Sequence, residues 1–169
     1  MTIRPETQED LALIHHVNQE AFARNHEADV VDRLREQGAL IISLVAVQDS
    51  AVIGHIAFSP VDIASEQSTF KGLALGPLAV LPSHQNKGTG SQLVRPGLEE
   101  CRRLGHKVIV LVGHLDYYPR FGFVPARAKG LECEFQVPDE AWMVLEIGED
   151  ALAIRQGKVS FHPEFRQAL

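Results

Sequence analysis

Three segments of the chain show the spacing of apolar residues that is typical of helices. From Gln8 to about Phe22, apolar residues recur every three or four positions, which predicts an amphipathic helix, and Thr7 is suited to cap its start. The same pattern around residues 30–34 predicts a second helix that ends near Gly38. A third and longer helix is predicted from Thr89 to about Leu104.

Between the second and third helices, the sequence changes to apolar and β-branched runs that are typical of strands. Two such runs, Leu40 to Val47 and Ala51 to Ile63, are separated by the turn residues 48–50, which predicts a hairpin. A further strand is predicted from Leu73 to Leu81. It carries the pair Gly76-Pro77, where we expect a bulge or a loss of pairing, because proline donates no hydrogen bond to a sheet.

The order of these elements predicts the fold class. Further strands are expected at Thr2 to Arg4, Lys107 to Val112, Phe123, Leu131 to Val137 and Trp142 to Ile147. Together with the helices they indicate an α/β (α+β) domain with a mixed sheet, over residues 1–147. Residues 148–169 are polar and are expected to form a C-terminal extension that is packed on this domain or peripheral to it.

Composition excludes several other classes of protein. A chain of 169 residues with 45% hydrophobic and 22% charged residues has the length and composition of one globular domain. Its net charge of −6 argues against a generic nucleic-acid binder, because that affinity rests on lysine and arginine. Cys101 and Cys133 form no C-x-x-C pair, and His15-His16 lacks a histidine four positions on, so no metal is expected. Cys101 lies on an apolar helix face and is expected to pack there.

The apolar runs are also short. None approaches the ~18 to 20 residues that a membrane span needs, and the N-terminal residues are polar. We therefore expect a cytoplasmic protein that binds no membrane.

The first candidate for chemistry is a strand, loop and helix between Leu78 and Ser91. Gly88 and Gly90 stand at the predicted helix start, where unpaired backbone N–H groups and the helix dipole favour an anion, and Lys87 adds a positive charge. The P-loop pattern is absent, and Leu93 stands where a dinucleotide fingerprint needs glycine or alanine. From the glycine spacing alone, a turn that merely starts a helix is an equally good interpretation.

The second candidate is the aromatic segment Tyr117 to Phe123. Taken alone, it predicts a short helical segment that packs against the sheet. Taken with Gln85-x-x-Gly88-x-Gly90, it resembles the GNAT superfamily of acyl-CoA-dependent N-acetyltransferases over Thr2 to about Ile147. The signatures at Pro77 to Val80 and in the aromatic segment are most similar to a bacterial group of predicted acetyltransferases.

The resemblance implies a GNAT fold, in which the mostly antiparallel sheet splays between the fourth and fifth strands and is flanked by helices. It implies acetyl-CoA as co-substrate, with the pantetheine arm beside the strand and the pyrophosphate at the loop and helix start. The implied cofactor-binding residues are Leu78, Ala79, Val80, Gln85, Asn86, Lys87, Gly88, Thr89, Gly90 and Ser91.

The resemblance also implies direct attack of a primary amine on the thioester, with Tyr118 as the acid that protonates the leaving thiolate. The base is less clear, because the strand before the loop lacks the glutamate that many relatives carry there. His114 is the candidate base, although the group often has aspartate at this position, and a surface histidine without a role is the alternative. Glu27 and a water relay are further alternatives.

Other functions stay open from the sequence. A non-catalytic acyl-CoA-binding or sensing module on the same fold is the main alternative, and an unrelated phosphate-binding protein is another. The acceptor is expected to be a small-molecule or peptide amine, with no nucleic acid involved. A homodimer is expected only by analogy. His55, within a strand, is expected to be half-buried with its hydrogen bonds satisfied.

Overall fold

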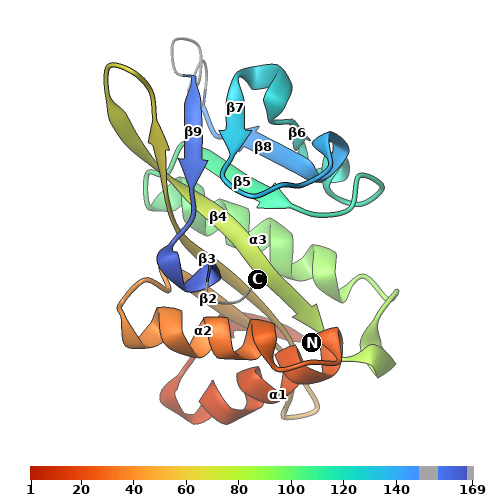
Figure 1. Cartoon of the computed structure of the whole chain (residues 1–169). Helices are drawn as coiled ribbons and strands as arrows, with labels where there is room; N and C mark the ends of the chain where they lie inside the picture. Colours follow the sequence, from red (N-terminus) through yellow and green to blue (C-terminus); the bar gives the residue numbers. More distant parts are fainter. Residues whose placement is uncertain (149–155, 167–169) are drawn as a thin grey trace.

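A computed structural model describes residues 1–148 and 156–166 of the chain. These residues form one sheet of nine strands with helices on both faces (Figure 1). In chain order, the strands are β1 (Thr2–Pro5), β2 (Ile42–Gln48), β3 (Ala51–Ala64), β4 (Thr69–Val80), β5 (Val108–Val112), β6 (Val124–Pro125), β7 (Leu131–Cys133), β8 (Trp142–Glu146) and β9 (Gly157–Ser160).

The helices are α1 (Leu11–Phe22), α2 (His26–Glu36) and α3 (Thr89–Arg103). Short 3₁₀ segments are η1 (Gln8–Asp10), η2 (Pro82–His84), η3 (Tyr118–Phe121), η4 (Arg127–Lys129), η5 (Asp139–Ala141) and η6 (Pro163–Phe165). In the described part of the chain, no helix has both the length and the apolar character to cross a membrane.

The sheet has the order β1-β2-β3-β4-β5-β8-β6, and β9 pairs with β3 and β7. All pairs are antiparallel except β4–β5 and β7–β9. The predicted mixed, mostly antiparallel α/β fold is therefore confirmed. The predicted strand from Leu131 is shorter than expected and ends at Cys133. The predicted helical segment before Gly122 is a single 3₁₀ turn that begins at Tyr118.

The two faces of the sheet are covered by different helices. Leu93, Val94 and Cys101 of α3 pack with β2, β3, β4 and β5 in the largest buried cluster. On the other face, Ile14 of α1 and Val31 of α2 pack on residues of β2, β3 and β4. Figure 1 shows this arrangement, with α1 and α2 in front of the sheet and α3 crossing behind β4. The strands between these layers are thus fixed from both sides.

The start of the first helix is fixed by charge as well as by capping. Asp10 accepts a hydrogen bond from the Thr7 backbone N–H at 2.7 Å and from its hydroxyl at 3.0 Å, and it pairs with Arg4 of β1 at 2.7 Å. The hydrogen bonds from Arg4 lower the pKa of the Asp10 carboxyl to about 2, although burial acts against this. The predicted cap therefore also ties the helix to the edge strand.

The pairing of β4 changes along its length. Ile56 of β3 is opposite Leu78, whereas Phe58 is opposite Leu75, so Gly76 and Pro77 face a single residue of β3 and form the predicted bulge. On its other side β4 pairs with β5 only at Leu73–Ile109 and Ala74–Val110. The expected splay between the fourth and fifth strands is thus confirmed, and beyond the bulge β4 has no partner on the β5 side in the described residues.

The described part of the C-terminal segment contributes to the sheet and to the core. β9 pairs with β3 at residues 62–64 of β3, and its residues 157–159 pair with the whole length of β7. Val159 and Phe161 are buried against Trp142 in a second cluster. The division into a domain of residues 1–147 and an extension of residues 148–169 stays a prediction, and residues 149–155 and 167–169 lie outside the described residues.

A chain of polar contacts runs from the buried face of β3 to the surface. The His55 ring is fully buried, not half-buried as expected, with Nδ1 3.2 Å from Asn18 Nδ2 and Nε2 2.8 Å from the Ser43 hydroxyl. Ser43 donates to Glu6, which pairs with Arg35 at 2.8 Å.

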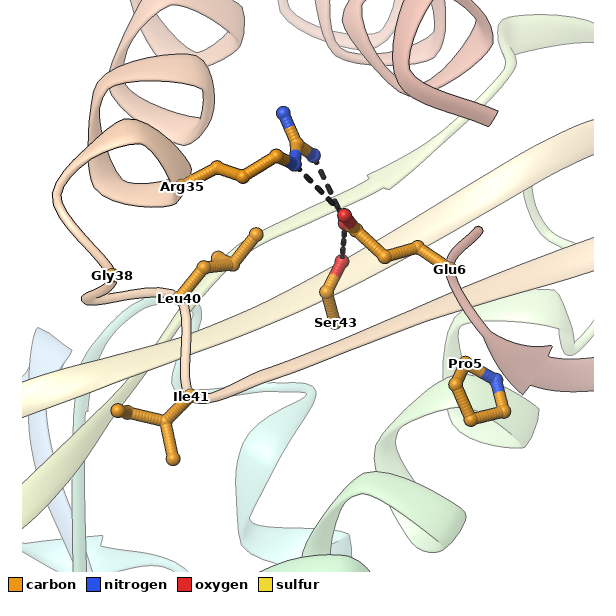
Figure 2. A pocket seen from close by; sticks show the side chains of 7 residues that line it. All are labelled: Pro5, Glu6, Arg35, Gly38, Leu40, Ile41 and Ser43. Carbon is orange, nitrogen blue, oxygen red and sulfur yellow. Dashed lines mark hydrogen bonds and ion pairs between the residues drawn. The ribbon is translucent and has the colours of Figure 1, made fainter. Parts of the chain in front are cut away.

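Figure 2 shows Arg35, Glu6 and Ser43 together in a pocket that they line with Pro5, Gly38, Leu40 and Ile41. None of the predicted site residues lines this pocket.

These contacts determine the protonation of His55. Because Ser43 donates its proton to Glu6, its oxygen accepts from His55 Nε2–H, and Nδ1 is left to accept from Asn18. The neutral ring is therefore fully satisfied. Burial lowers the pKa of His55 to about 4; the charge of Glu6 acts against this effect and that of Arg35 adds to it.

We predict that the free energy of unfolding decreases as the pH falls from about 6.5 toward 4. In this range His55 takes up a proton in the unfolded chain but stays neutral in the folded protein. The loss is on the order of 2–3 kcal/mol. Urea unfolding at several pH values should show it, and His55→Gln should remove most of the pH dependence in this range. His16→Gln, an exposed histidine of α1, is the control. An equal pH dependence in His55→Gln and wild type would contradict the assignment.

Candidate active site

The loop between β4 and α3 leaves several backbone N–H groups without a partner in the helix. The first α-helical hydrogen bond runs from the Gln92 N–H to the Gly88 carbonyl at 3.1 Å, so the amides of residues 89–91 precede it. Gly88 has a φ of 86° and Asn86 a φ of 62°, and open space surrounds the position of a Gly88 side chain. This end of α3 therefore has the form and the partial positive charge of an anion site.

The end of β4 is tied to this loop. The side-chain amide of Gln85 donates to the Val80 carbonyl at 2.9 Å, and the Leu81 N–H donates to Ile53 of β3. Lys87 donates to the Ser83 carbonyl at 3.2 Å and is exposed. In this structure Gln85 and Lys87 hold the loop in place.

Tyr117 joins the aromatic segment to the start of α3. Its hydroxyl lies 3.0 Å from the Ser91 hydroxyl. A side chain at Gly90 would place its Cβ 2.8 Å from the Tyr117 oxygen and 3.7 Å from Leu78 Cδ2. Three elements thus converge at Gly90, namely β4, α3 and the segment before η3, and glycine is required there by a close approach.

Tyr118, the next residue of the aromatic segment, packs beside the end of β5. A Cβ at Gly113 would lie only 2.4 Å from Tyr118 Cε2, so the ring occupies the space directly beside the end of β5. Tyr117 and Phe123 make edge-on contacts with this ring at centroid distances of 5.0 Å and 5.9 Å. Burial, with a smaller contribution from Tyr117, raises the pKa of Tyr118 to about 12, so the phenol keeps its proton at neutral pH.

His114 lies two residues after the end of β5 and is exposed. Its carbonyl accepts hydrogen bonds from the Tyr117 and Tyr118 N–H groups at 3.1 Å and 3.3 Å, which starts the turn that presents both tyrosines. Within residues 1–148 and 156–166, its imidazole has no hydrogen-bond partner.

Comparison with known proteins shows the family. Residues 2–126 match the family model described as an acetyltransferase (GNAT) domain. The chain belongs to the GNAT acetyltransferases. This GNAT chain is also 36% identical over 168 residues to the uncharacterised N-acetyltransferase YhbS of Escherichia coli strain K12, and the match covers 99% of both chains.

Solved structures agree with this membership. A crystal structure of YhbS from E. coli in complex with CoA has a TM-score of 0.92 and 34% identity, and the match covers 98% of this chain and 91% of the other. A GNAT family acetyltransferase from Brucella melitensis in complex with acetyl-CoA has a TM-score of 0.81 and 38% identity, with 97% of both chains covered. The predicted GNAT fold and acetyltransferase family are thus confirmed.

The other candidate groups of this GNAT chain include side chains that are already paired with a neighbour or buried. Glu27 pairs with Arg24 at 2.5 Å. His15, Asp29 and Asp32 bring ligand atoms within 4.8 Å of one another, but Asp32 already pairs with His15 at 2.7 Å. The thiol of Cys101 is buried on α3, as expected, and burial raises its pKa to about 12.

The sequence alone does not predict that Gly90 and Gly113 make room for Tyr117 and Tyr118. Gly113 has no motif of its own, although a glycine directly after a strand and five positions before an aromatic residue is a signal of close packing. No signal in the sequence assigns a role to Arg120, inside the aromatic motif, or to Arg95, on the exposed face of α3. Their surroundings depend on the contact between two elements that are distant in the sequence.

We predict that the cost of Gly90→Ala depends on the Tyr117 hydroxyl. In the wild-type background the new methyl group meets that oxygen, and the free energy of unfolding should fall by roughly 1–3 kcal/mol. In a Tyr117→Phe background the nearest ring atom is 3.7 Å away, so the same substitution should cost much less. Urea unfolding of the four proteins measures the coupling. Equal costs in both backgrounds would rule out the contact.

Proposed function

We propose that this chain transfers an acetyl group from acetyl-CoA to a primary amine by direct attack in a ternary complex. The observation that carries the proposal is that pairing between β4 and β5 ends at Ala74, while Tyr118 packs beside the end of β5 and Tyr117 beside the start of α3. An acyl donor needs an extended path that ends beside a proton donor, and this arrangement offers one. The acetyl-CoA bound by the Brucella melitensis relative supports the same donor.

The backbone of β4 and the loop would hold the donor. Leu78, Ala79 and Val80 lie beyond the bulge, where β4 is paired only with β3, so their free edge suits the amide groups of pantetheine. The Val80 carbonyl is taken by Gln85, which leaves the other groups of this edge for the donor. The pyrophosphate would lie at the loop and the first turn of α3, over residues 86–91.

The proposed chemistry is proton transfer around a tetrahedral intermediate. The amine nitrogen forms a bond to the thioester carbon, and a backbone N–H between Leu78 and Val80 stabilises the oxyanion. The carbon–sulfur bond then breaks, and the Tyr118 phenol faces the leaving thiolate. Because its pKa is well above the ~8.5 of a thiol, its main contribution is a hydrogen bond that strengthens as charge develops on sulfur.

His114 is proposed as the base that accepts the amine proton. It is exposed and begins the turn that holds Tyr118, and a neutral imidazole nitrogen can accept a proton. The proton would pass from the attacking nitrogen to an imidazole nitrogen. A His114→Gln variant with the same pH–rate profile as wild type would exclude this role and leave a water relay.

The acceptor is proposed to be a small-molecule or peptide amine. The net charge of −6 favours a cationic amine over a nucleic acid. Cytoplasmic location and a homodimer belong to the same proposal, by analogy with other GNAT acetyltransferases. A non-catalytic acyl-CoA sensor is the second candidate, because β4 lacks an acidic residue before the loop.

We predict that negative charge at Gly88 abolishes acetyl-CoA binding. Gly88→Asp and Gly88→Asn share the backbone conformation and nearly the same size, and only aspartate repels the pyrophosphate. Calorimetry should therefore show no binding to Gly88→Asp and a clearly measurable affinity for Gly88→Asn. Equal affinities in the two variants would place the pyrophosphate elsewhere.

We predict that Tyr118→Phe keeps the affinity for acetyl-CoA but lowers the rate of acetyl transfer roughly 10²-fold, because only the hydrogen bond to sulfur is lost. The rate is measured as thiol release from acetyl-CoA with a panel of primary amines, and the affinity by calorimetry on the same sample. An unchanged rate would remove Tyr118 from the mechanism. Wild-type binding without thiol release from any amine would favour the sensor.

A further inference from the structure

Most basic side chains of the described residues are neutralised by a carboxylate. Ion pairs join them to aspartate or glutamate, many within one helical turn and some between elements. The paired residues are Arg4, Arg24, Arg33, Arg35, Lys71, Arg102, Arg103, Arg127, Lys129 and Arg166. Basic residues are thus usually paired in this acidic chain, and exceptions identify places where positive charge is left uncompensated.

Five basic residues of the described part form no ion pair with a carboxylate, and three of these belong to α3 or to a segment next to it. Lys87 is in the loop before α3, Arg95 is in the second turn of α3, and Arg120 is in η3, which packs on that helix. Lys107 and Lys158 lie elsewhere, at the start of β5 and in β9. The uncompensated charge is therefore concentrated around the N-terminal half of α3.

The Arg120 guanidinium is held in place by neutral groups only. Its Nε donates to the Tyr117 carbonyl at 2.8 Å and its Nη2 to the Asp116 carbonyl at 3.2 Å, and its carbon lies 4.5 Å from the centre of the Tyr117 ring. These contacts fix one edge of the fork, and among the residues that the structure describes the edge formed by Nη1 and Nη2 has no partner. A fixed guanidinium with a free edge binds phosphate in a bidentate way at little cost in entropy.

Arg95 complements this group from the helix side. Its guanidinium carbon lies 5.0 Å from the centre of the Phe121 ring, and it makes no hydrogen bond in the described residues. Phe121 in turn contacts Tyr117 at a centroid distance of 5.3 Å, and the Tyr117 hydroxyl reaches Ser91 in the first turn of α3. The two stacked arginines are thus connected through aromatic contacts to the proposed pyrophosphate site.

We infer that Arg95 and Arg120 bind the 3′-phosphate of CoA and make this chain selective for CoA over dephospho-CoA. The inference rests on the proposed acetyl-CoA function. CoA carries its 3′-phosphate one ribose away from the pyrophosphate, and this monoester is its most highly charged single group near neutral pH. The backbone amides at the start of α3 would bind the pyrophosphate. A second phosphate with two negative charges is bound best by guanidinium groups that lie beside that helix start.

The test compares two ligands and four proteins by calorimetry. Wild type should bind CoA about 10- to 100-fold more tightly than dephospho-CoA, which is the effect expected for charge-assisted hydrogen bonds to one phosphate. Arg95→Gln and Arg120→Gln should each weaken the binding of CoA about tenfold while changing that of dephospho-CoA less than about twofold. Lys107→Gln removes an unpaired charge at the far end of α3 and should preserve the wild-type preference.

The outcomes separate the inference from the function on which it rests. Equal affinity of wild type for the two ligands would overturn the inference and leave the acetyl-CoA function standing. A loss of affinity for both ligands in an arginine variant would assign that arginine to folding of the aromatic segment, and would overturn its role in phosphate recognition. Wild-type protein that binds neither ligand would overturn the CoA site and the inference together.

Discussion

The candidate site depends on the point at which β4 stops pairing with β5. Gly76 and Pro77 face one residue of β3, and proline has no N–H to donate, so β4 bends at this bulge. The parallel ladder ends two residues earlier, at Ala74. From there β4 is held by β3 alone, which leaves one backbone edge available over the residues that lead to the loop. Without this early end of the ladder, β5 would cover that edge.

Two adjacent tyrosines pack at the elements that flank this unpaired edge of β4. Tyr118 fills the space beside Gly113 at the end of β5, and Tyr117 fills the space beside Gly90 at the start of α3. Each glycine is needed because a ring atom or hydroxyl stands where a side chain would begin. The same contacts bury the Tyr118 phenol and raise its pKa, so the geometry of the segment and its chemistry have one cause.

Local signals in the sequence predicted most of the fold, and long-range contacts account for the rest. The cap at Thr7, the hairpin turn at residues 48–50 and the bulge at Gly76-Pro77 each follow from residue types within a few positions. The pairing of β9 with β3 and β7 could not be predicted, because short polar strands carry no signal of their partners. For the same reason the burial of His55 was underestimated: its partners come from α1 and β2.

Net charge is a poor guide to the charge of this site. The chain has an excess of acidic residues, yet eleven of its 22 acids pair with arginines or lysines elsewhere in the fold. Around the N-terminal half of α3 the balance is reversed, because Arg95 and Arg120 stack on aromatic rings and donate at most to backbone carbonyls. An aromatic ring fixes a guanidinium without neutralising it, whereas a carboxylate does both. The choice of partner for each arginine therefore decides where an acidic protein can receive an anionic ligand.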